Sequence, residues 1–265
     1  MENSDKKNHL YDPYNNDINL LWTGGWDSTF RLLELSTKQV TIQPFYLKDN
    51  RRSETNEFKA MSWISNQIKK ESTTKAKINE LIVLNRFDIE IDETTKKAYS
   101  SIKLKVPKLG SQYEWLSAFS QTVKGLELSL EKGSKMDYLT QSYGKRITIE
   151  NKIFGDFVVL DNENSPKDLV DLIGEFHFPI LDKTKVDMKT QMENLGLMHI
   201  MNKTWFCHRP INDKPCGICV PCIQAMEKGM KYRFDSASIF RHKIHKFFEP
   251  IMNTKFYKKI KRLGV

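Results

Sequence analysis

All four cysteines of the chain lie in its last quarter, at a spacing that suits one metal ion. Cys207, Cys216, Cys219 and Cys222 follow the pattern C-x8-C-x2-C-x2-C. Four thiolates this close in sequence can surround a single tetrahedral zinc ion, and Gly217 gives the turn between them the backbone freedom to wrap it. The pattern therefore predicts a structural Zn2+ site. The alternative is a pair of disulfides, which would require an oxidising compartment.

A second group of chemically capable residues lies near the other end of the chain. The run Thr23-Gly24-Gly25-Trp26-Asp27-Ser28-Thr29 separates the apolar residues 18–22 from an apolar stretch that begins at Phe30. This arrangement predicts a tight turn from a buried strand into a helix. Two adjacent glycines let backbone N–H groups converge on an anion, while three hydroxyls and the helix N-terminus add donors. We therefore expect this turn to bind phosphate; an ordinary strand-to-helix connection is the alternative.

Asp27 is the informative member of this turn. Its negative charge would repel a phosphate group unless a divalent cation lay between the two. The turn therefore predicts a nucleotide bound together with Mg2+, with Asp27 and Ser28 close to the reacting phosphates.

The turn resembles the S-G-G-x-D-S motif of the PP-loop ATP pyrophosphatases, with Thr23 keeping the hydroxyl of the first serine. It is not a Walker A loop, because no Gly-Lys-Ser/Thr sequence follows it. The resemblance implies ATP as a substrate and an α/β fold like that of the adenine nucleotide alpha hydrolases.

The cysteine spacing is also similar to the C-terminal knuckle of one branch of these enzymes, the 7-cyano-7-deazaguanine synthase family. Just before it, Pro179-Ile180-Leu181-Asp182-Lys183-Thr184-Lys185 resembles that family's Pro-Leu-x-x-x-Thr-Lys segment. The resemblance covers about residues 18–228, and it implies that Lys185 lies near the nucleotide phosphates. A solvated surface lysine is the alternative, and Arg209 has the same two interpretations.

Two departures from the family pattern bear on the substrate. Where the family has Pro-Gly-Arg-Asn, this chain has Pro107-Lys108-Leu109-Gly110, and no cysteine before Cys207 can match the family's Asp-Cys-Arg element. Both departures concern the substrate, and neither affects the nucleotide chemistry or the metal site.

The resemblance implies an ATP-dependent ligase. A small carboxylate like 7-carboxy-7-deazaguanine would be adenylated with loss of pyrophosphate, and ammonia or an amine would then give a nitrile or an amide. Alternatives are a PP-loop enzyme with another acid or acceptor, such as a protein, sugar or specialised metabolite, and a PP-loop enzyme that modifies tRNA. A zinc-ribbon binding module would leave the phosphate turn unexplained.

Strands and helices should alternate along the chain, which predicts a doubly wound, mainly parallel sheet. Further strands are expected at 40–46, 78–84 and 136–140, and a helix at 57–68, whereas 86–108 is expected to be irregular. Three later helices should begin at capping boxes, in which a hydroxyl residue precedes an acid by three positions. These pairs are Ser111 with Glu114, Ser165 with Asp168, and Thr184 with Asp187; in the last helix Met188, Met192 and Leu195 should point inward.

We divide the chain into a polar segment (1–17), the nucleotide-binding domain (18–200), the zinc-knuckle segment (201–230) and a basic C-terminal tail (231–265). The polar start contains no apolar core of a signal sequence, and no long apolar run follows. We therefore expect a reduced, cytoplasmic enzyme. His177, His199 and His208 are expected to be ordinary, partly buried polar residues.

The net charge of +9 comes mostly from the tail, where residues 241–265 hold eight Lys or Arg residues against the single acid Glu249. Apolar residues alternate with these cations, so packing on the protein body or a homodimer contact, an anionic membrane surface, and RNA all remain open. Pro250 predicts two short helices in this tail.

Overall fold

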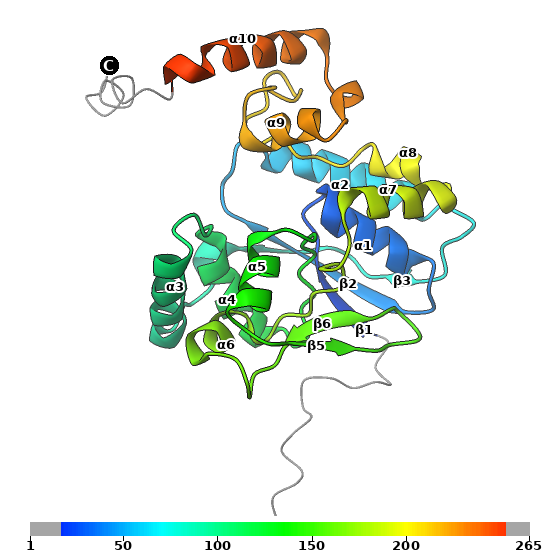
Figure 1. The fold of residues 1–265 in the computed structure, drawn as a ribbon. Coiled ribbons are helices and arrows are strands. Elements are labelled where there is room, and N and C mark those ends of the chain that lie inside the picture. Colours follow the sequence, from blue (N-terminus) through cyan, green and yellow to red (C-terminus); the bar gives the residue numbers. More distant parts are fainter. Residues whose placement is uncertain (1–16, 253–265) are drawn as a thin grey trace, which may run out of the picture. The chain divides into compact units, whose positions relative to one another are not determined.

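The computed structural model describes residues 17–252, which divide into two compact units (Figure 1). The larger unit holds the described residues up to Asp49 together with Ala60–Thr204. The second, which we call the cysteine unit, holds Asn50–Lys59 and the residues from Trp205 onward. The predicted polar segment 1–17, apart from its last residue, and the end of the tail, 253–265, lie outside the described residues.

The larger unit is built on a mainly parallel sheet, as predicted. Strands β1 (Asp17–Leu21), β3 (Lys77–Ile78) and β4 (Ile82–Asn85) each pair in parallel with β2 (Thr41–Lys48). Beyond β1, parallel bridges join Leu20 to Glu127 and Glu127 to His177. The carboxyl ends of these parallel segments therefore lie at one edge of the sheet, the edge at which ligands bind in open α/β proteins.

An antiparallel hairpin extends this arrangement on the far side of the His177 segment. Its strands are β5 (Arg146–Ile149) and β6 (Phe157–Leu160), and Val158 of β6 forms an antiparallel bridge to Phe178.

Helices cover both sides of the sheet (Figure 1). They are α1 (Trp26–Ser36), α2 (Glu54–Ile68), α3 (Glu93–Lys105), α4 (Gln112–Thr122), α5 (Lys135–Ser142), α6 (Lys167–Ile173), α7 (Lys185–Asn194) and α8 (Met198–Met201), with a 3-10 helix η1 (Arg86–Asp88). On one side, α3, α4 and α6 share a core with Leu21, Phe45 and Leu47 of the sheet. The rings of Phe45 and Phe119 meet edge to face at 5.5 Å, which fixes α4 on β2.

A buried ion pair joins α1 to the segment beside β1. The Arg31 guanidinium donates to both carboxylate oxygens of Glu127, at 2.9 and 2.6 Å, and these two side chains are 1% and 2% exposed. Glu34 and the Phe154 carbonyl accept the remaining Arg31 hydrogen bonds. Burial by itself lowers the pKa of Arg31, but the two carboxylates raise it above its ordinary value. The charge is thus fully compensated inside the core.

Two predicted elements are wrong in kind. Residues 86–108 are not irregular, because they contain η1 and helix α3. Asp92 caps α3 by accepting from the Thr95 N–H at 2.9 Å. Residues 136–140 form part of helix α5, which begins where Ser134 accepts from the Asp137 N–H at 3.1 Å. The place of the expected fourth strand is taken by the segment around Glu127. The third strand, predicted at 78–84, is broken into β3 and β4.

Only one of the three predicted capping boxes forms. Thr184 and Asp187 make both reciprocal bonds at the start of α7. Ser111 makes no cap bond at the start of α4. At α6 the N-cap is Pro166 rather than Ser165. The Ser165 hydroxyl does not cap the helix but accepts from the Lys145 N–H at 2.9 Å.

The inward face of α7 is shorter than predicted. Met188 and Met192 are buried, but Leu195 at the helix end is 36% exposed. The helix stops there, and Gly196 follows with a positive φ of 71°.

The cysteine unit holds α9 (Val220–Glu227), a 3-10 helix η2 (Lys231–Arg233) and α10 (Ser236–Met252). Its small core gathers three of the cysteines with Ala225 and Phe234. Helix α10 runs through Pro250 to Met252, so the predicted break at that proline is wrong within residues 236–252. In the part of the chain that the structure describes, no helix is both long and apolar enough to cross a bilayer.

Candidate metal centre and phosphate-binding turn

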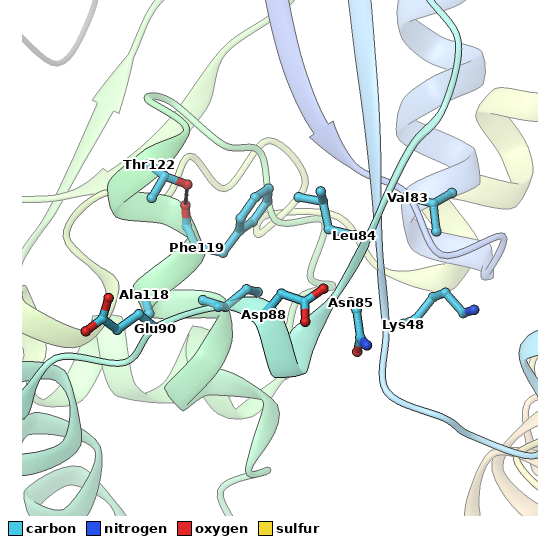
Figure 2. Close-up of a pocket in the computed structure, with 10 residues that line it drawn as sticks. Lys48, Val83, Leu84, Asn85, Asp88, Glu90, Ala118, Phe119 and Thr122 are labelled. Atoms are coloured by element: carbon cyan, nitrogen blue, oxygen red, sulfur yellow. Dashed lines mark hydrogen bonds between the residues drawn. The ribbon is translucent and has the colours of Figure 1, made fainter.

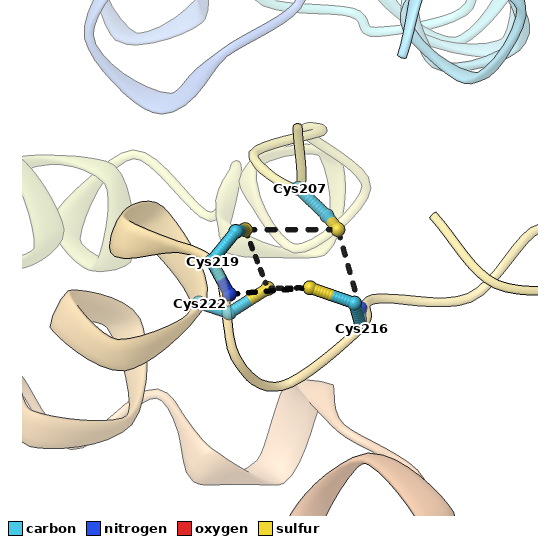
Figure 3. Close-up of side chains that lie close together, drawn as sticks. All are labelled: Cys207, Cys216, Cys219 and Cys222. Atoms are coloured by element: carbon cyan, nitrogen blue, oxygen red, sulfur yellow. Dashed lines mark hydrogen bonds between the residues drawn. The ribbon is translucent and has the colours of Figure 1, made fainter. Parts of the chain in front are cut away.

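The four cysteine side chains converge on one point (Figure 3). Their Sγ atoms all lie within 4.8 Å of one another, with separations of 3.8 Å for Cys216–Cys222, 3.9 Å for Cys207–Cys219 and 3.4 Å for Cys219–Cys222. Zn–S bonds of about 2.3 Å in a tetrahedron place sulfur atoms about 3.8 Å apart. The cluster can therefore hold a metal ion such as zinc, and all four thiols are free of disulfides.

Backbone N–H groups are aimed at the same sulfur atoms. The Cys216 N–H donates to Cys207 Sγ at 3.2 Å, and the N–H groups of Ile218 and Cys219 donate to Cys216 Sγ at 3.4 and 3.3 Å. Such donors stabilise thiolates, which are the metal-binding form of cysteine. They support a metal centre with four protein ligands and no open position.

The thiols also interact strongly with one another. The hydrogen bond with Cys219 raises the pKa of Cys207 to about 12, and bonds to Cys207 and Cys219 raise the pKa of Cys222. The hydrogen bonds with Cys207 and Cys222 lower the pKa of Cys219 itself. Without a cation, one thiolate is thus favoured at the expense of the others. A divalent metal ion would allow all four to ionise.

The turn between the metal ligands is locked onto α10. Gly217 has a φ of 83°, and a Cβ atom at this position would collide with the Ser238 carbonyl. Arg241 Nε donates to the Cys216 carbonyl at 2.8 Å, and His242 Nδ1 lies 3.2 Å from the Gly217 carbonyl. Glycine is therefore required at position 217 for two reasons: its positive φ and the close approach of α10.

The predicted phosphate turn lies between β1 and α1, at the carboxyl edge of the sheet. Gly24 has a φ of 68°, and Gly25 is the N-cap of α1 without a side-chain cap bond. The backbone N–H groups of Gly24 and Gly25 make no hydrogen bond to another described residue. Both N–H groups lie at the N-terminus of α1, where they are available to an anion.

The hydroxyl residues of the turn have different surroundings. Ser28 Oγ accepts from the Thr23 N–H at 3.2 Å. It also lies 3.2 Å from Thr23 Oγ1, so the two hydroxyl groups are within hydrogen-bond distance of each other. Thr29 is fully buried, and its hydroxyl accepts from the Trp22 indole at 3.0 Å. Trp26 is also buried, at 8% exposure. Thr29 and Trp26 therefore pack the turn, and Ser28, at 6% exposure, is also buried, whereas Thr23 is partly buried.

Lys185 reaches this turn from the start of α7, far away in the sequence. Its ammonium group forms an ion pair with the Asp27 carboxylate, and it lies 3.7 Å from the Glu131 carboxylate. The side chains of Lys185, Asp27 and Glu131 are 20 to 24% exposed, so the cluster is accessible from solvent. The sequence placed Lys185 beside the turn through its family resemblance, and the structure brings Lys185 and Asp27 together.

Sequence reasoning missed Glu131 and its neighbour Ser129. Ser129 is 8% exposed, and its hydroxyl has no partner among the described residues. Residues 126–131 read Leu-Glu-Leu-Ser-Leu-Glu, an alternation typical of a half-buried strand. This alternation would have placed Glu127, Ser129 and Glu131 on one face of an extended segment beside β1.

The remaining candidates lie in ordinary surroundings. Arg209 and His208 are exposed in the cysteine unit. His199 is exposed and pairs with Glu71 at 2.9 Å, while His177 is partly buried and stacks on Phe157 at 4.5 Å. Of the three histidines, only His177 is partly buried as predicted.

A pocket of about 630 Å³ opens beside the carboxyl ends of β2 and β4 (Figure 2). Its charged and polar lining residues are Lys48, Asn85, Asp88, Glu90 and Thr122, and Phe119 is among its apolar ones. In the sheet, β2 lies between β1 and β4. The pocket is therefore at the same edge as the phosphate turn, about two strand spacings away, or roughly 10 Å.

Comparison with models of known protein families finds no match for this chain, and comparison with curated protein sequences finds none either.

Proposed function

We propose that the chain is an ATP-dependent ligase that adenylates a carboxylate, releases pyrophosphate, and passes the activated acyl group to a nitrogen nucleophile. The observation that carries this proposal is the convergence of three features at one edge of the sheet. They are a glycine turn with free N–H donors at the start of α1, the acid Asp27 in that turn, and Lys185 beside it. In fold terms, we propose a doubly wound PP-loop domain.

The first step is adenylyl transfer. A carboxylate oxygen of the acid attacks the α-phosphorus of ATP, the new O–P bond forms, and the bond from that phosphorus to the bridging oxygen breaks. Both electrons of the broken bond leave with pyrophosphate. The N–H groups of Gly24 and Gly25 and the hydroxyls of Thr23 and Ser28 would offset the charge that develops on this leaving group.

Lys185 is expected to change its partner when ATP binds. In the nucleotide-free protein its ammonium group is paired with Asp27. The triphosphate of ATP carries more negative charge than a single carboxylate. We therefore expect Lys185 to move its hydrogen bonds to the phosphates when ATP binds. Asp27 and Glu131 would then be the oxygen ligands available for Mg2+, which supplies charge neutralisation of the triphosphate.

The second step forms the carbon–nitrogen bond. The nitrogen lone pair attacks the acyl carbon, the C–O bond to AMP breaks, and the nitrogen loses a proton to solvent, which leaves an amide. A nitrile requires a second ATP: the amide oxygen is adenylated with loss of pyrophosphate, and AMP then departs as two N–H protons are lost.

The pocket beside β2 and β4 is the candidate site for the acid. It is large enough for a bicyclic molecule, and its polar groups are of mixed charge: Lys48 is the cation, and Asp88 and Glu90 are the acids. A lysine suits a carboxylate substrate, and the acids suit hydrogen-bond donors on a ring. The resemblance to the 7-cyano-7-deazaguanine synthase family makes 7-carboxy-7-deazaguanine the first acid to test.

The absence of that family's arginine, asparagine and first cysteine elements favours a second candidate. In this version adenylation is the same, but another acid is activated, or the acceptor is a protein, a sugar or another amine. We give the cysteine cluster a structural role in both versions, because four thiolates would leave a zinc ion no open position for substrate.

The test is ATP–pyrophosphate exchange with a panel of carboxylates that includes 7-carboxy-7-deazaguanine. The proposal predicts exchange that depends on one acid, and that acid identifies the substrate class. The matched pair of variants is Lys185→Ala and Lys189→Ala on the same helix, since Lys189 forms an ion pair with the exposed Glu193. Loss in the first and retention in the second would support the proposed site. Absence of exchange with every acid, or equal exchange in both variants, would contradict it.

A further inference from the structure

Helix α10 contacts the metal-ligand turn through its polar side. Arg241 and His242 bond to the carbonyls of Cys216 and Gly217, and the Ser238 hydroxyl donates to the Pro215 carbonyl. Ser238 is fully buried. The helix is therefore anchored by hydrogen bonds, with Ile239 as its apolar contact to the small core.

Its apolar side is exposed. Phe240 and Phe247 are 63% and 75% exposed, and Ile244 and Phe248 are 42% and 46% exposed. We call these four residues the aromatic stripe. Their spacing of four, seven and eight residues from Phe240 places them within an arc of about 100° on one face of a helix. This face is opposite the one that carries Ser238 and His242.

The polarity of α10 is thus the reverse of that of an ordinary packed helix, whose apolar side faces the protein. Exposing four large apolar side chains in a row is unfavourable in water, so this pattern marks an interaction site. The rings of Phe247 and Phe248 contact each other edge to face at 5.2 Å.

Cations border the aromatic stripe. At 100° per residue, Arg241 and Lys243 lie at its two borders, and the exposed Lys246 lies farther round the helix. In residues 241–265 the single acid is Glu249, and five more lysines or arginines follow Met252 in the sequence. A surface with apolar side chains at its centre and cations at its border complements an anionic lipid surface, in which acyl chains lie beneath negative headgroups.

We propose that α10 binds the surface of a membrane containing anionic phospholipids, with the aromatic stripe inserted at the acyl boundary and the lysines among the headgroups. A second copy of the chain is less suited to this face, because it would bring cations of like sign together. RNA would pair with the cations but would leave Ile244 without a partner. This proposal does not depend on the ligase reaction.

The test is sedimentation of the full-length, metal-loaded protein with vesicles. One set is phosphatidylcholine alone, and the other contains phosphatidylserine in about one third of its lipid. We expect at least a tenfold tighter association with the anionic vesicles, weakened by added salt. Phe240→Ser/Phe247→Ser and, separately, Lys243→Glu/Lys246→Glu should each weaken it about tenfold or more.

The matched control is Leu104→Ser/Val186→Ser, which removes two apolar side chains that are 84% and 71% exposed elsewhere in the chain. It should bind vesicles like the unmodified protein. We expect unchanged metal content in every variant, because the aromatic stripe lies opposite Ser238 and His242, which attach the helix to the turn. That result shows that the cysteine unit is intact. The proposal is overturned by equal binding to both vesicle types, by no binding, or by equal loss in the control. It is also overturned if the phenylalanine variant loses only self-association in sedimentation velocity or only binding of a single-stranded RNA.

Discussion

The cysteine cluster and the phosphate turn are assembled in opposite ways. The cluster takes all of its ligand atoms from one short stretch, residues 207–222, and its sulfur atoms are already at metal-binding distances. The turn supplies only part of its site, because Lys185 and Glu131 arrive from segments far away in the sequence. Local spacing therefore identifies a site of the first kind, whereas the second requires knowledge of which strands are neighbours.

The two regions also balance charge differently. Around the phosphate turn, protein groups compensate one another: Lys185 faces two carboxylates, and Arg31 is enclosed by Glu34 and Glu127. In the cysteine cluster the partners of the sulfur atoms are N–H groups and other thiols. We therefore expect the cysteine unit to depend on a metal ion and the larger unit to be stable without one.

The largest predicted effect is on the cysteine unit. Cys216→Ser, or removal of zinc by a chelator, should destabilise this unit by up to about 10 kcal/mol, because metal binding and folding are coupled. Metal analysis should find one zinc per chain in the unmodified protein and a large loss in the variant, and amides of α9 should exchange rapidly. Ile218→Ser, in the same turn, is the control that keeps all four ligands. Wild-type zinc content after Cys216→Ser would contradict the assignment.

The next effect concerns the stability of the larger unit. Arg31→Met should lower its free energy of unfolding by about 3–5 kcal/mol, because Glu127 would remain charged and buried without its partner. Urea denaturation measures the change. Adding Glu127→Leu should recover part of the loss. If the double variant lost more unfolding free energy than the two single variants together, this pairing would be contradicted.

Asp27 tests the chemistry of the turn without disturbing either fold. Asp27→Asn should reduce ATP–pyrophosphate exchange at least about 100-fold, through loss of a metal ligand at the triphosphate. Zinc content and thermal stability should stay unchanged. Retained exchange would show that this carboxylate does not serve the nucleotide.

Glu131 should have a smaller effect of the same kind. Glu131→Gln keeps the size of the side chain and removes its charge, so we expect about a tenfold loss of exchange that higher Mg2+ concentrations partly restore. Glu163→Gln, on an exposed loop, is the control. Unchanged exchange in Glu131→Gln would show that Glu131 does not take part in the reaction.

The smallest effect is a loss of stability in acid. Asp168 accepts from Lys105, Ser101 and Tyr143 at 2.6 to 2.9 Å. Burial by itself raises the pKa of Asp168, but these donors lower it below its ordinary value. The stabilisation is then fully present above the unfolded pKa, near 4, and is lost as pH falls through the lower folded value. Urea midpoints at about pH 6 and about pH 3 should differ less in Asp168→Asn than in the unmodified chain, whereas Asp182→Asn should change nothing.

The sequence predicted what depends on neighbouring residues. It located β1, α1, β2 and α7, the Thr184–Asp187 capping box and the cysteine cluster, because each is determined by a short pattern of types. It failed at residues 136–140, where an apolar run was interpreted as a strand although Ser134 caps a helix.

It also failed where tertiary contacts decide. Glu127 and Ser129 occupy a central position beside β1 that only strand pairing identifies, although the alternation of residues 126–131 was present. Residues 241–265 were recognised as apolar and basic, but the exposure of the aromatic stripe depends on how Ser238 and His242 attach α10 to the cysteine turn.

The most direct test of the account is a crystal structure with Mg2+ and a non-hydrolysable ATP analogue. We predict the phosphates against the N–H groups of Gly24 and Gly25, with the Lys185 ammonium transferred from Asp27 to a phosphate oxygen. An ordered nucleotide bound elsewhere, with the turn unchanged and Lys185 still paired with Asp27, would contradict it.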